Sequence, residues 1–423
     1  MLLTFRLQCY IIKVRKGDFM LCQFTFENFR SYKNETVLDL QAVSGQNFQK
    51  SLLKSNNDKN EFLPVSVIYG PNGGGKSNVL NAINCIVSLV MKPIQIFKNN
   101  IPQSFVTELA PFIFDDTSRN EPTKFDLYFR PNDEYEYRYF IAVTNGVIIE
   151  EELHRRKLGR GSKITTIFER NSDNIELGAG IKNKKVNTEV NDQMPYLSFL
   201  YINYKLEPII LAVNWFEKCI IRNYASPYTE DRIILEESNE FKNKLLTLMN
   251  DVGINISNYD FVKSSDDENS YELIFEHTVN GKAYQLNIAQ ESAGTQKLFN
   301  ALPLAIIALT EGRLLVIDEL DAKLHPKLLK FIIMLFKNPE INTKNAQLIF
   351  TSHDVSTMKS SVFRTDEIWF ACKLNDESSD LYSLYELRDE SGNHIHPSAA
   401  FDKQYLEGRY GADPYFRNIM DWK

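Results

Sequence analysis

The stretch Val65-Ser-Val-Ile-Tyr-Gly-Pro-Asn-Gly-Gly-Gly-Lys-Ser-Asn-Val-Leu80 decides the fold that we expect. It reads as a short apolar strand, a glycine-rich turn and the first turn of a helix. Gly70 to Ser77 satisfies the pattern G-x-x-x-x-G-K-[ST] of a phosphate-binding loop, or Walker A motif. The alternative is a chance glycine turn before a helix, but strand, loop and helix all stand in the required order. The stretch therefore predicts a nucleoside triphosphate site.

The residue types of this loop suit phosphate chemistry. Glycines allow positive φ and close approach, and their amides form a positively polarised nest with the helix N-terminus. Lys76 would add a charge at the β- and γ-phosphates, and the Ser77 hydroxyl would help to hold Mg²⁺. The expected nucleotide-binding residues of the loop are Gly70, Asn72, Gly73, Gly74, Gly75, Lys76, Ser77 and Asn78.

Composition indicates an ordinary folded chain of one large or two smaller domains. Its 423 residues are 43% hydrophobic and 24% charged, with a net charge of −7. That charge gives no general attraction to nucleic acid or anionic membrane. Five cysteines without a C-x-x-C pair argue against disulfides or a zinc site, and no apolar run approaches a membrane span. We expect a soluble cytoplasmic protein with no membrane partner.

Residues 1–19 fit poorly with the rest of the chain. They mix apolar and basic residues, without the apolar centre of a signal peptide. A well-patterned strand follows Met20, so we expect the natural start there and treat 1–19 as an extension. A genuine basic arm is the alternative.

Coarse patterning predicts further elements. We expect strands at 24–31, 36–40, 112–114, 125–129, 137–141 and 146–150, and helices at 77–91, 208–222 and 240–249. Pro93 should end the first helix. Thr123-Lys-Phe-Asp126 matches a guanine-reading motif superficially, but it leads into a strand instead of following one, so ATP is favoured. Two basic clusters, His154-Arg155-Arg156-Lys157 with Arg160 and Lys163, and Lys182 with Lys184 and Lys185, could contact a phosphate backbone, although such runs are more often solvated surface.

Two later apolar runs end in acidic or histidine side chains that could bind a metal ion or take part in catalysis. Arg313 to Glu319 reads as a buried parallel strand whose last residues reach a site. Asp318 there would hold Mg²⁺, and Glu319 would activate the attacking water. Ala346 to His353 is a second such strand, and His353 could sense the γ-phosphate. Taken singly, strand-end acids and loop histidines are common, so their weight comes from occurring together.

A second anion site is expected at Glu291-Ser-Ala-Gly-Thr-Gln-Lys-Leu298, where small residues precede a helix. Pro303 should kink that helix. The ordered set of Walker A, this signature (Ser292 to Gln296), Walker B (Leu314 to Glu319), D-loop (Leu320-Asp321) and His353 resembles the head of ABC-type ATPases, including SMC and RecF. Asn28-Phe-Arg-Ser31, followed by a strand and the loop, resembles their opening.

This resemblance implies an α/β fold: an ABC-type (SMC/RecF-like) P-loop ATPase head with a compact inserted α+β lobe. It also implies an ATP-sandwiched homodimer, in which Ser292 and Gly294 of one protomer face the nucleotide of the other, and it implies that Asp321 of the D-loop binds nucleotide. Arg30 would lie near the nucleotide. The expected division is an N-terminal ATPase lobe over 20–150, an inserted lobe over 151–285 and a C-terminal ATPase lobe over 286–423.

A narrower resemblance rests on Gly294 to Leu298, Asp318 to Pro326, Thr351-Ser-His-Asp354 and the tail Tyr405 to Ala412. These resemble the RloA and AbiL-type ATPases of prokaryotic phage-defence loci, with AriA of PARIS and PtuA of Septu as more distant relatives. The resemblance implies dimerisation coupled to a separately encoded effector, such as an RloB or Toprim-related nuclease, in abortive infection. Lys323, His325 and Arg409 follow its pattern without a clear role.

Two departures leave points open. The signature has Ser-Ala-Gly where transporters have Ser-Gly-Gly, and neither Gln95 nor Gln103 is securely the metal-binding glutamine of the Q-loop. The alternative function is a RecF-like ATPase that grips DNA in repair or DNA architecture; DNA or RNA contact and larger assemblies stay open. A fused nuclease is disfavoured because only about seventy residues follow His353. A transporter subunit is disfavoured by the inserted lobe and the tail.

Overall fold

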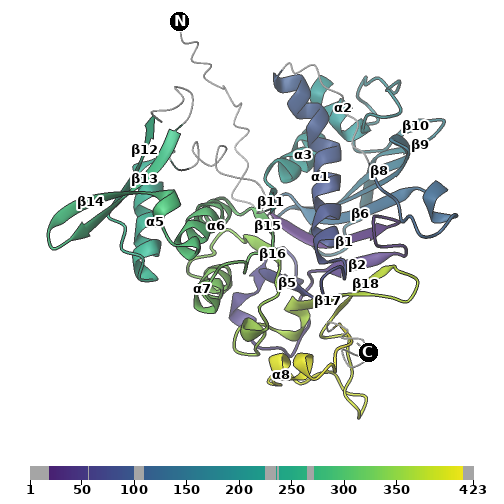
Figure 1. The fold of residues 1–423 in the computed structure, drawn as a ribbon. Coiled ribbons are helices and arrows are strands. Elements are labelled where there is room, and N and C mark those ends of the chain that lie inside the picture. Colours follow the sequence, from purple (N-terminus) through teal and green to yellow (C-terminus); the bar gives the residue numbers. More distant parts are fainter. Residues whose placement is uncertain are drawn as a thin grey trace, which may run out of the picture.

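The computed structural model describes residues 19–55, 57–99, 109–223, 235, 238–263 and 271–412. Apart from Phe19, the expected extension 1–19 lies outside these residues, and so does Gln103. Figure 1 shows a central sheet, a second large sheet beside it and a smaller lobe on the opposite side.

The central sheet is parallel except at one edge. Its order is β11 (Ile220–Asn223), β15 (Leu314–Asp318), β16 (Gln347–Thr351), β5 (Val65–Tyr69), β17 (Ile368–Lys373) and β18 (Ser379–Ser383), with β18 antiparallel to β17. Both faces are buried, because alternate residues of one strand enter different cores: Val316 joins one and Leu315 the other. Burial on both faces explains why these strands are continuous apolar runs.

The second sheet is an antiparallel meander that packs on one face of the central sheet. Its order is β10 (Ile175–Leu177), β9 (Ile164–Asn171), β8 (Val147–Lys157), β7 (Tyr135–Thr144), β6 (Thr123–Arg130), β1 (Met20–Glu27) and β2 (Thr36–Asp39). Helix α1 (Lys76–Asn99) shares a core with both sheets, together with α2 (Tyr196–Asn203) and α3 (Glu207–Glu217). Two short strands that follow β2 in the sequence, β3 (Leu53–Lys54) and β4 (Glu61–Phe62), form a separate antiparallel pair.

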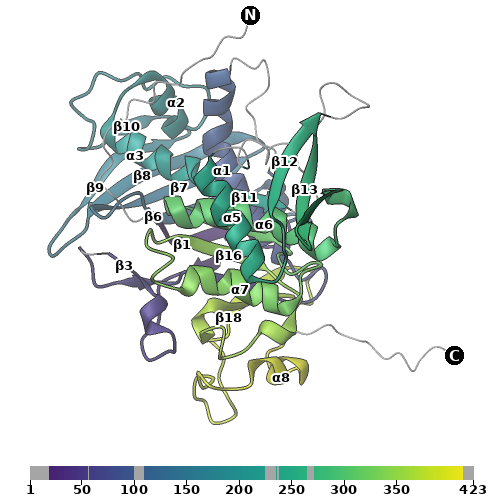
Figure 2. The same ribbon diagram turned by 90° about the vertical axis from the view of Figure 1, so that its left-hand side faces the viewer.

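The other face of the central sheet carries α6 (Ala293–Glu311) and α7 (Pro326–Lys337). Outside them lies the small lobe, made of α5 (Asn239–Asp251), β12 (Asn258–Lys263), β13 (Tyr271–Val279) and β14 (Lys282–Asn287), with the three strands in one antiparallel sheet (Figure 2). The tail helix α8 (Phe401–Leu406) packs at the β17 side, where Tyr405 stacks on Phe370. Short 3₁₀ turns connect these elements.

The boundary expected between Glu150 and Glu151 falls inside β8. Residues 151–177 continue the antiparallel meander through β8, β9 and β10, whereas β12 to β14 form a separate sheet. The segment 151–285 therefore contributes to two different sheets and also supplies β11 to the central one.

Some expected elements are wrong. Helix α1 continues past Pro93 to Asn99, because residues on both sides, such as Met91 and Ile94, are buried, and core packing outweighs a penalty of about 3 kcal/mol for an internal proline. Residues 112–114 form no strand, and the end of the expected helix 208–222 is β11.

Helix α1 is also, among the described residues, the one helix long and apolar enough to cross a membrane, and 67% of its apolar window is buried. Its apolar character is accounted for by its place between the two large sheets. The predicted fold class is confirmed: an α/β head of ABC type, with the glycine-rich loop between a central parallel strand and a helix.

Candidate nucleotide site

The glycine-rich loop joins β5 to α1 at the carboxyl end of the parallel strands, and the neighbouring strands dictate its glycines. Gly70 has φ +144°, and a Cβ there would lie 2.0 Å from the carbonyl oxygen of Ala371 in β17. Gly75 has φ +108°, and a Cβ there would lie 2.5 Å from Oγ of Ser379 in β18. Since a side chain would be strained and crowded at both places, glycine fixes the shape of the loop.

Lys76 lies at the first position of α1 with its side chain folded over the loop. Its Nζ donates to the carbonyl oxygens of Gly70 at 2.9 Å and Pro71 at 3.0 Å. Burial lowers the pKa of Lys76, and the carboxylates at the end of β15, led by Asp318, act in the opposite direction. The ammonium group is therefore held where the loop would cradle the phosphates.

Ser77, Asp318 and Thr351 form a hydrogen-bonded cluster across three elements. The hydroxyls of Ser77 and Thr351 both donate to Oδ1 of Asp318, at 3.1 and 2.6 Å, and the Glu319 N–H donates to Thr351 Oγ1 at 2.7 Å. Hydroxyl and carboxylate oxygens are the ligands that Mg²⁺ prefers. The described residues contain no group of three or more His, Cys, Asp or Glu side chains with metal-ligand geometry. The Ser77 and Asp318 oxygens fit as ligands of a Mg²⁺ ion whose remaining ligands would include phosphate oxygens.

The expected hydrolytic residues lie beside this cluster and are exposed. Glu319, immediately after β15, has φ +50°, a left-handed conformation uncommon for a residue with a side chain. The His353 N–H donates to Oδ2 of Asp321 at 2.8 Å, so the D-loop and the turn after β16 are joined within one chain. Glu319 and His353 are both solvent-exposed. The structure brings Asp318, Glu319, Asp321 and His353 together at one edge of the sheet.

The signature residues Ser292 and Gly294 lie at the start of α6, next to the turn that follows β15. Ser292 is the exposed N-cap of α6, and its Oγ accepts from the Thr295 N–H at 3.1 Å. A Cβ on Gly294 would have as nearest neighbours the Lys323 carbonyl at 3.5 Å and Ser292 Oγ at 3.8 Å, with no atom of the glycine-rich loop within 4 Å. The signature therefore lies beside the D-loop of its own chain.

The remaining predicted residues surround the loop. Arg30 is exposed, and its Nη1 lies 3.5 Å from Oδ1 of Asn78 in the first turn of α1. Asn78 also donates to Oγ of Ser31 at 2.8 Å. Asn72 and Gly73 are exposed at the tip of the loop. Arg30 thus stands next to the helix that follows the phosphate-binding loop.

The three motif residues to which no clear role was assigned, Lys323, His325 and Arg409, lie in a turn, at a helix N-cap and in a surface ion pair. His325 is the N-cap of α7, since its Nδ1 accepts from the Lys327 N–H at 3.2 Å. Lys323 is exposed with φ +63° in the turn before it. Arg409 is exposed and paired with Glu407.

Sequence reasoning missed two residues of the site. Thr351 belongs to the motif Thr351-Ser-His-Asp354, but the sequence assigns it no role. Its hydroxyl links Asp318 to the Glu319 backbone, because β15 and β16 are neighbours in a register that pairs Ile317 with Phe350. Lys297 was quoted within the signature, and its Nζ donates to the Glu319 carbonyl at 3.1 Å. Neither contact has a local sequence signal.

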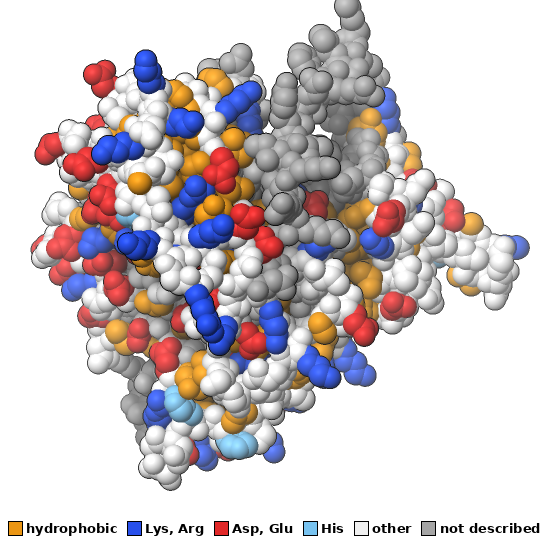
Figure 3. All heavy atoms as spheres, turned by 180° about the vertical axis from the view of Figure 1, so that it is seen from behind, with side chains coloured by type: hydrophobic (Ala, Val, Ile, Leu, Met, Phe, Trp, Pro, Cys, Tyr) orange, Lys and Arg blue, Asp and Glu red, His pale blue; other side chains and the backbone are white. Residues whose placement is uncertain are grey.

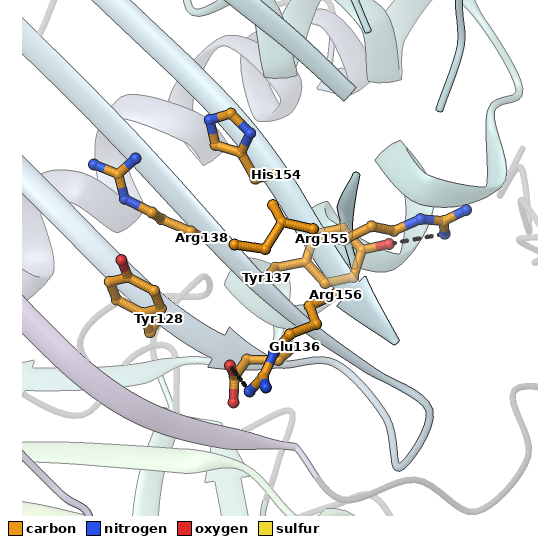
Figure 4. Close-up of a pocket in the computed structure, with 8 residues that line it drawn as sticks. Tyr128, Glu136, Tyr137, Arg138, His154, Arg155 and Arg156 are labelled. Atoms are coloured by element: carbon orange, nitrogen blue, oxygen red, sulfur yellow. Dashed lines mark hydrogen bonds and ion pairs between the residues drawn. The ribbon is translucent and has the colours of Figure 1, made fainter. Parts of the chain in front are cut away.

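The basic run His154 to Lys157 is divided between the two faces of β8. Side chains alternate along a strand, so Arg155 and Arg156 point to opposite sides. Arg156 pairs with Glu136 at 2.7 Å, and Arg155 pairs with Glu207 at 2.8 Å and donates to the Tyr137 hydroxyl (Figure 4). The run is therefore not one continuous basic surface.

A cavity of about 240 Å³ is lined by residues of strands β6 to β9, among them Arg138, Arg155 and Arg156. The charged side chains that line it are paired with one another or with neighbouring acids. Arg138 donates to both carboxylate oxygens of Asp126, from Nε to Oδ1 and from Nη2 to Oδ2, and its Nη1 contacts Glu152 at 2.8 Å; Glu152 also lies 3.1 Å from the His154 ring. Figure 3 shows acidic and basic side chains interspersed on the face that it presents. This pairing does not favour the phosphate-backbone contact considered for residues 154–157, whereas Lys182, Lys184 and Lys185 are exposed.

One family model matches more than half of the chain. A family model described as "AAA domain, putative AbiEii toxin, Type IV TA system" matches residues 65–359. Two solved structures of the recombination mediator protein RecF in the RecFOR pathway are similar. RecF with ATPrS gives a TM-score of 0.32 at 14% identity, covering 86% of this chain and 98% of that chain. RecF with ATP gives a TM-score of 0.34 at 12% sequence identity, and the match covers 86% of this chain and 100% of that chain. No curated protein matches the chain.

Proposed function

The chain belongs to the AAA-domain family described as "putative AbiEii toxin, Type IV TA system", and from this premise we propose that it is a Mg²⁺-dependent ATPase of the RloA/AbiL type. In this proposal two protomers close around two ATP molecules. The ATP-bound dimer controls a separately encoded effector, a nuclease of the RloB or Toprim-related kind, in defence against phage.

One observation carries the nucleotide part of the proposal. The Ser77 hydroxyl and the Asp318 carboxylate meet at 3.1 Å at the base of a loop whose glycines are dictated by neighbouring strands. These two oxygens would hold Mg²⁺, which supplies charge neutralisation for the phosphates when bound. Lys76 would exchange its bonds to the loop carbonyls for phosphate oxygens.

Hydrolysis is assigned to the exposed residues around this cluster. Glu319 would accept a proton from the attacking water, and His353 would contact the terminal phosphate. Both side chains are exposed in a single chain, whereas phosphoryl transfer is favoured where bulk water is excluded. Ser292 is exposed at the start of α6, and no atom of the glycine-rich loop lies within 4 Å of a Cβ on Gly294; both observations support a pocket that a second protomer completes.

The effector and the defence role are supported by the family description and by the motif set from Gly294 to Ala412. The RecF-like alternative requires a surface that grips nucleic acid. The arginines of β7 and β8 are paired with acids and supply no continuous basic surface for that purpose, which leaves the exposed Lys182, Lys184 and Lys185 as the basic cluster that could serve it. Salt-sensitive, ATP-dependent DNA binding without a protein partner would nevertheless favour the alternative.

The test expresses the chain with the product of the neighbouring gene, measures co-purification, and challenges the cells with phage. We expect protection from the native pair and its loss with Lys76→Ala and with Glu319→Gln. Lys330→Ala, at an exposed position of α7, is the matched control and should protect like the native chain. Protection that survives both Lys76→Ala and Glu319→Gln would contradict the proposal.

A further inference from the structure

Lys297 connects the signature helix to the Walker B strand within one chain. It lies on α6, five residues after Ser292, and its side chain is buried, with 7% of the residue exposed. Its Nζ donates to the carbonyl oxygen of Glu319 at 3.1 Å. This contact joins the helix that presents Ser292 to the backbone of the residue assigned to water activation.

The Glu319 backbone is held on both sides by side chains. Its N–H donates to Thr351 Oγ1 at 2.7 Å, and its carbonyl accepts from Lys297 and from the Ala322 N–H at 3.1 Å. With φ at +50°, this peptide is in a conformation that residues with side chains disfavour. Such a conformation persists where the surroundings over-determine it, and it sets the direction of the Glu319 side chain.

A buried lysine is costly at this position, so its ammonium group calls for an explanation. Burial lowers the pKa of Lys297 to about 8, against the opposing effect of Asp321, Glu319 and Asp318, while Lys323 acts with burial. Its neighbours on α6, Leu298 and Phe299, are buried and apolar. Packing alone would be satisfied by methionine, which fills a similar volume without the desolvation cost.

We propose that Lys297 is a positioning residue for ATP hydrolysis. Its hydrogen bond to the Glu319 carbonyl keeps the left-handed turn in the conformation that aims the carboxylate at the reacting water. The proposal rests on the proposed ATPase function and deepens it.

The test compares steady-state ATP hydrolysis by the full chain with Lys297→Met, Lys297→Arg and the exposed control Lys330→Met. Loss of a residue that orients a catalytic group costs about 10- to 100-fold, so we expect kcat of Lys297→Met to fall by that factor. Because Lys297 donates to the Glu319 carbonyl, whereas Lys76 is the lysine that donates to the loop carbonyls, KM for ATP should stay within about twofold. Lys297→Arg, which keeps a charged donor, should recover at least half of the lost activity on a logarithmic scale.

The proposal is overturned if Lys297→Met keeps its kcat, or if KM rises by the factor by which kcat falls. Thermal melts establish that each variant is folded at the assay temperature. If Lys297→Met is unfolded there, Lys297→Arg decides: a kcat as low as that of Glu319→Gln overturns the proposal. Failure of the ATPase function itself is distinguishable, because the native chain would then not hydrolyse ATP or Glu319→Gln would hydrolyse it at the native rate.

Discussion

Thr351 and Asp318 end two neighbouring parallel strands, and the Thr351 hydroxyl donates to Oδ1 of Asp318 across 2.6 Å. The same hydroxyl accepts from the Glu319 N–H at 2.7 Å. One side chain thereby orients both the expected Mg²⁺ ligand and the backbone of the expected water-activating residue. Thr351 is fully buried, so no solvent molecule would replace this hydroxyl without rearrangement.

Replacing Thr351 with valine tests this arrangement, because valine keeps the shape and removes the hydroxyl. Partners that orient metal ligands are worth about 10- to 100-fold in activity, and we expect kcat for ATP to fall by that factor. Thr351→Ser, which keeps the hydroxyl, is the control and should stay within about threefold of the native chain. Equal activity of the valine and serine variants would refute the role of the hydroxyl.

Lys76→Ala should abolish tight nucleotide binding while leaving the fold intact. The ammonium group, now bound to the Gly70 and Pro71 carbonyls, is the one that would contact the phosphates. A hydrogen bond to a charged group contributes about 1.5–3 kcal/mol, so ATP affinity should weaken by about 10- to 150-fold. Isothermal titration calorimetry measures this effect, with Lys330→Ala as control. Native affinity in Lys76→Ala would rule out the loop as the phosphate site.

Glu319→Gln should separate binding from hydrolysis. Glutamine cannot accept the proton of the attacking water, so kcat should fall by about 10²- to 10⁴-fold while ATP affinity is retained. ATP-bound dimers should then accumulate and be visible by light scattering after chromatography. Removing Mg²⁺ with EDTA should suppress both hydrolysis and dimer formation in the native chain. A Glu319→Gln variant that hydrolyses ATP normally would show that another residue activates the water.

Gly70→Ala should destabilise the protein more than Gly45→Ala does. Both glycines have positive φ, but a Cβ at Gly70 would meet the Ala371 carbonyl at 2.0 Å, whereas Gly45 has no neighbour within 4 Å. Crowding of this kind costs about 1–3 kcal/mol, and the two positions also differ in backbone strain, because φ of Gly45 (+78°) lies close to the left-handed helical region and φ of Gly70 (+144°) lies far outside it. Thermal melts of the two variants measure the difference. Equal melting temperatures would mean that the loop moves away from β17 at little cost.

Much of the site was predictable because each of its motifs is local. Gly70 to Ser77 carries loop chemistry, and Asp318 and His353 follow apolar runs, so their places at strand ends followed from the sequence alone. The order of β5, β15 and β16 in the sheet was not predictable from local pattern. For that reason nothing in the sequence indicated that the Thr351 hydroxyl contacts Asp318, or that the Lys297 ammonium group contacts the Glu319 carbonyl.

The errors in the fold have the same origin. Pro93 breaks a helix by local rules, but the core that buries Met91 and Ile94 holds α1 together beyond it. The segment 220–223 reads as the end of a helix, and it becomes a strand by pairing with β15, nearly 100 residues later in the sequence. The basic run at 154–157 reads as a patch, and strand alternation together with acids on β7 and α3 divides it.

The central claim is that each hydrolytic pocket combines the loop of one protomer with the signature of another. Mixing Lys76→Ala with Gly294→Trp measures this claim directly, since each variant should be inactive alone for a different reason. In a mixed dimer, the intact loop of one protomer meets the intact signature of the other. The account predicts recovery to about a quarter of the native rate per protomer in an equimolar mixture, because half of the dimers are mixed and each has one working pocket. A mixture as inactive as its components, or full activity of Gly294→Trp alone, would contradict it.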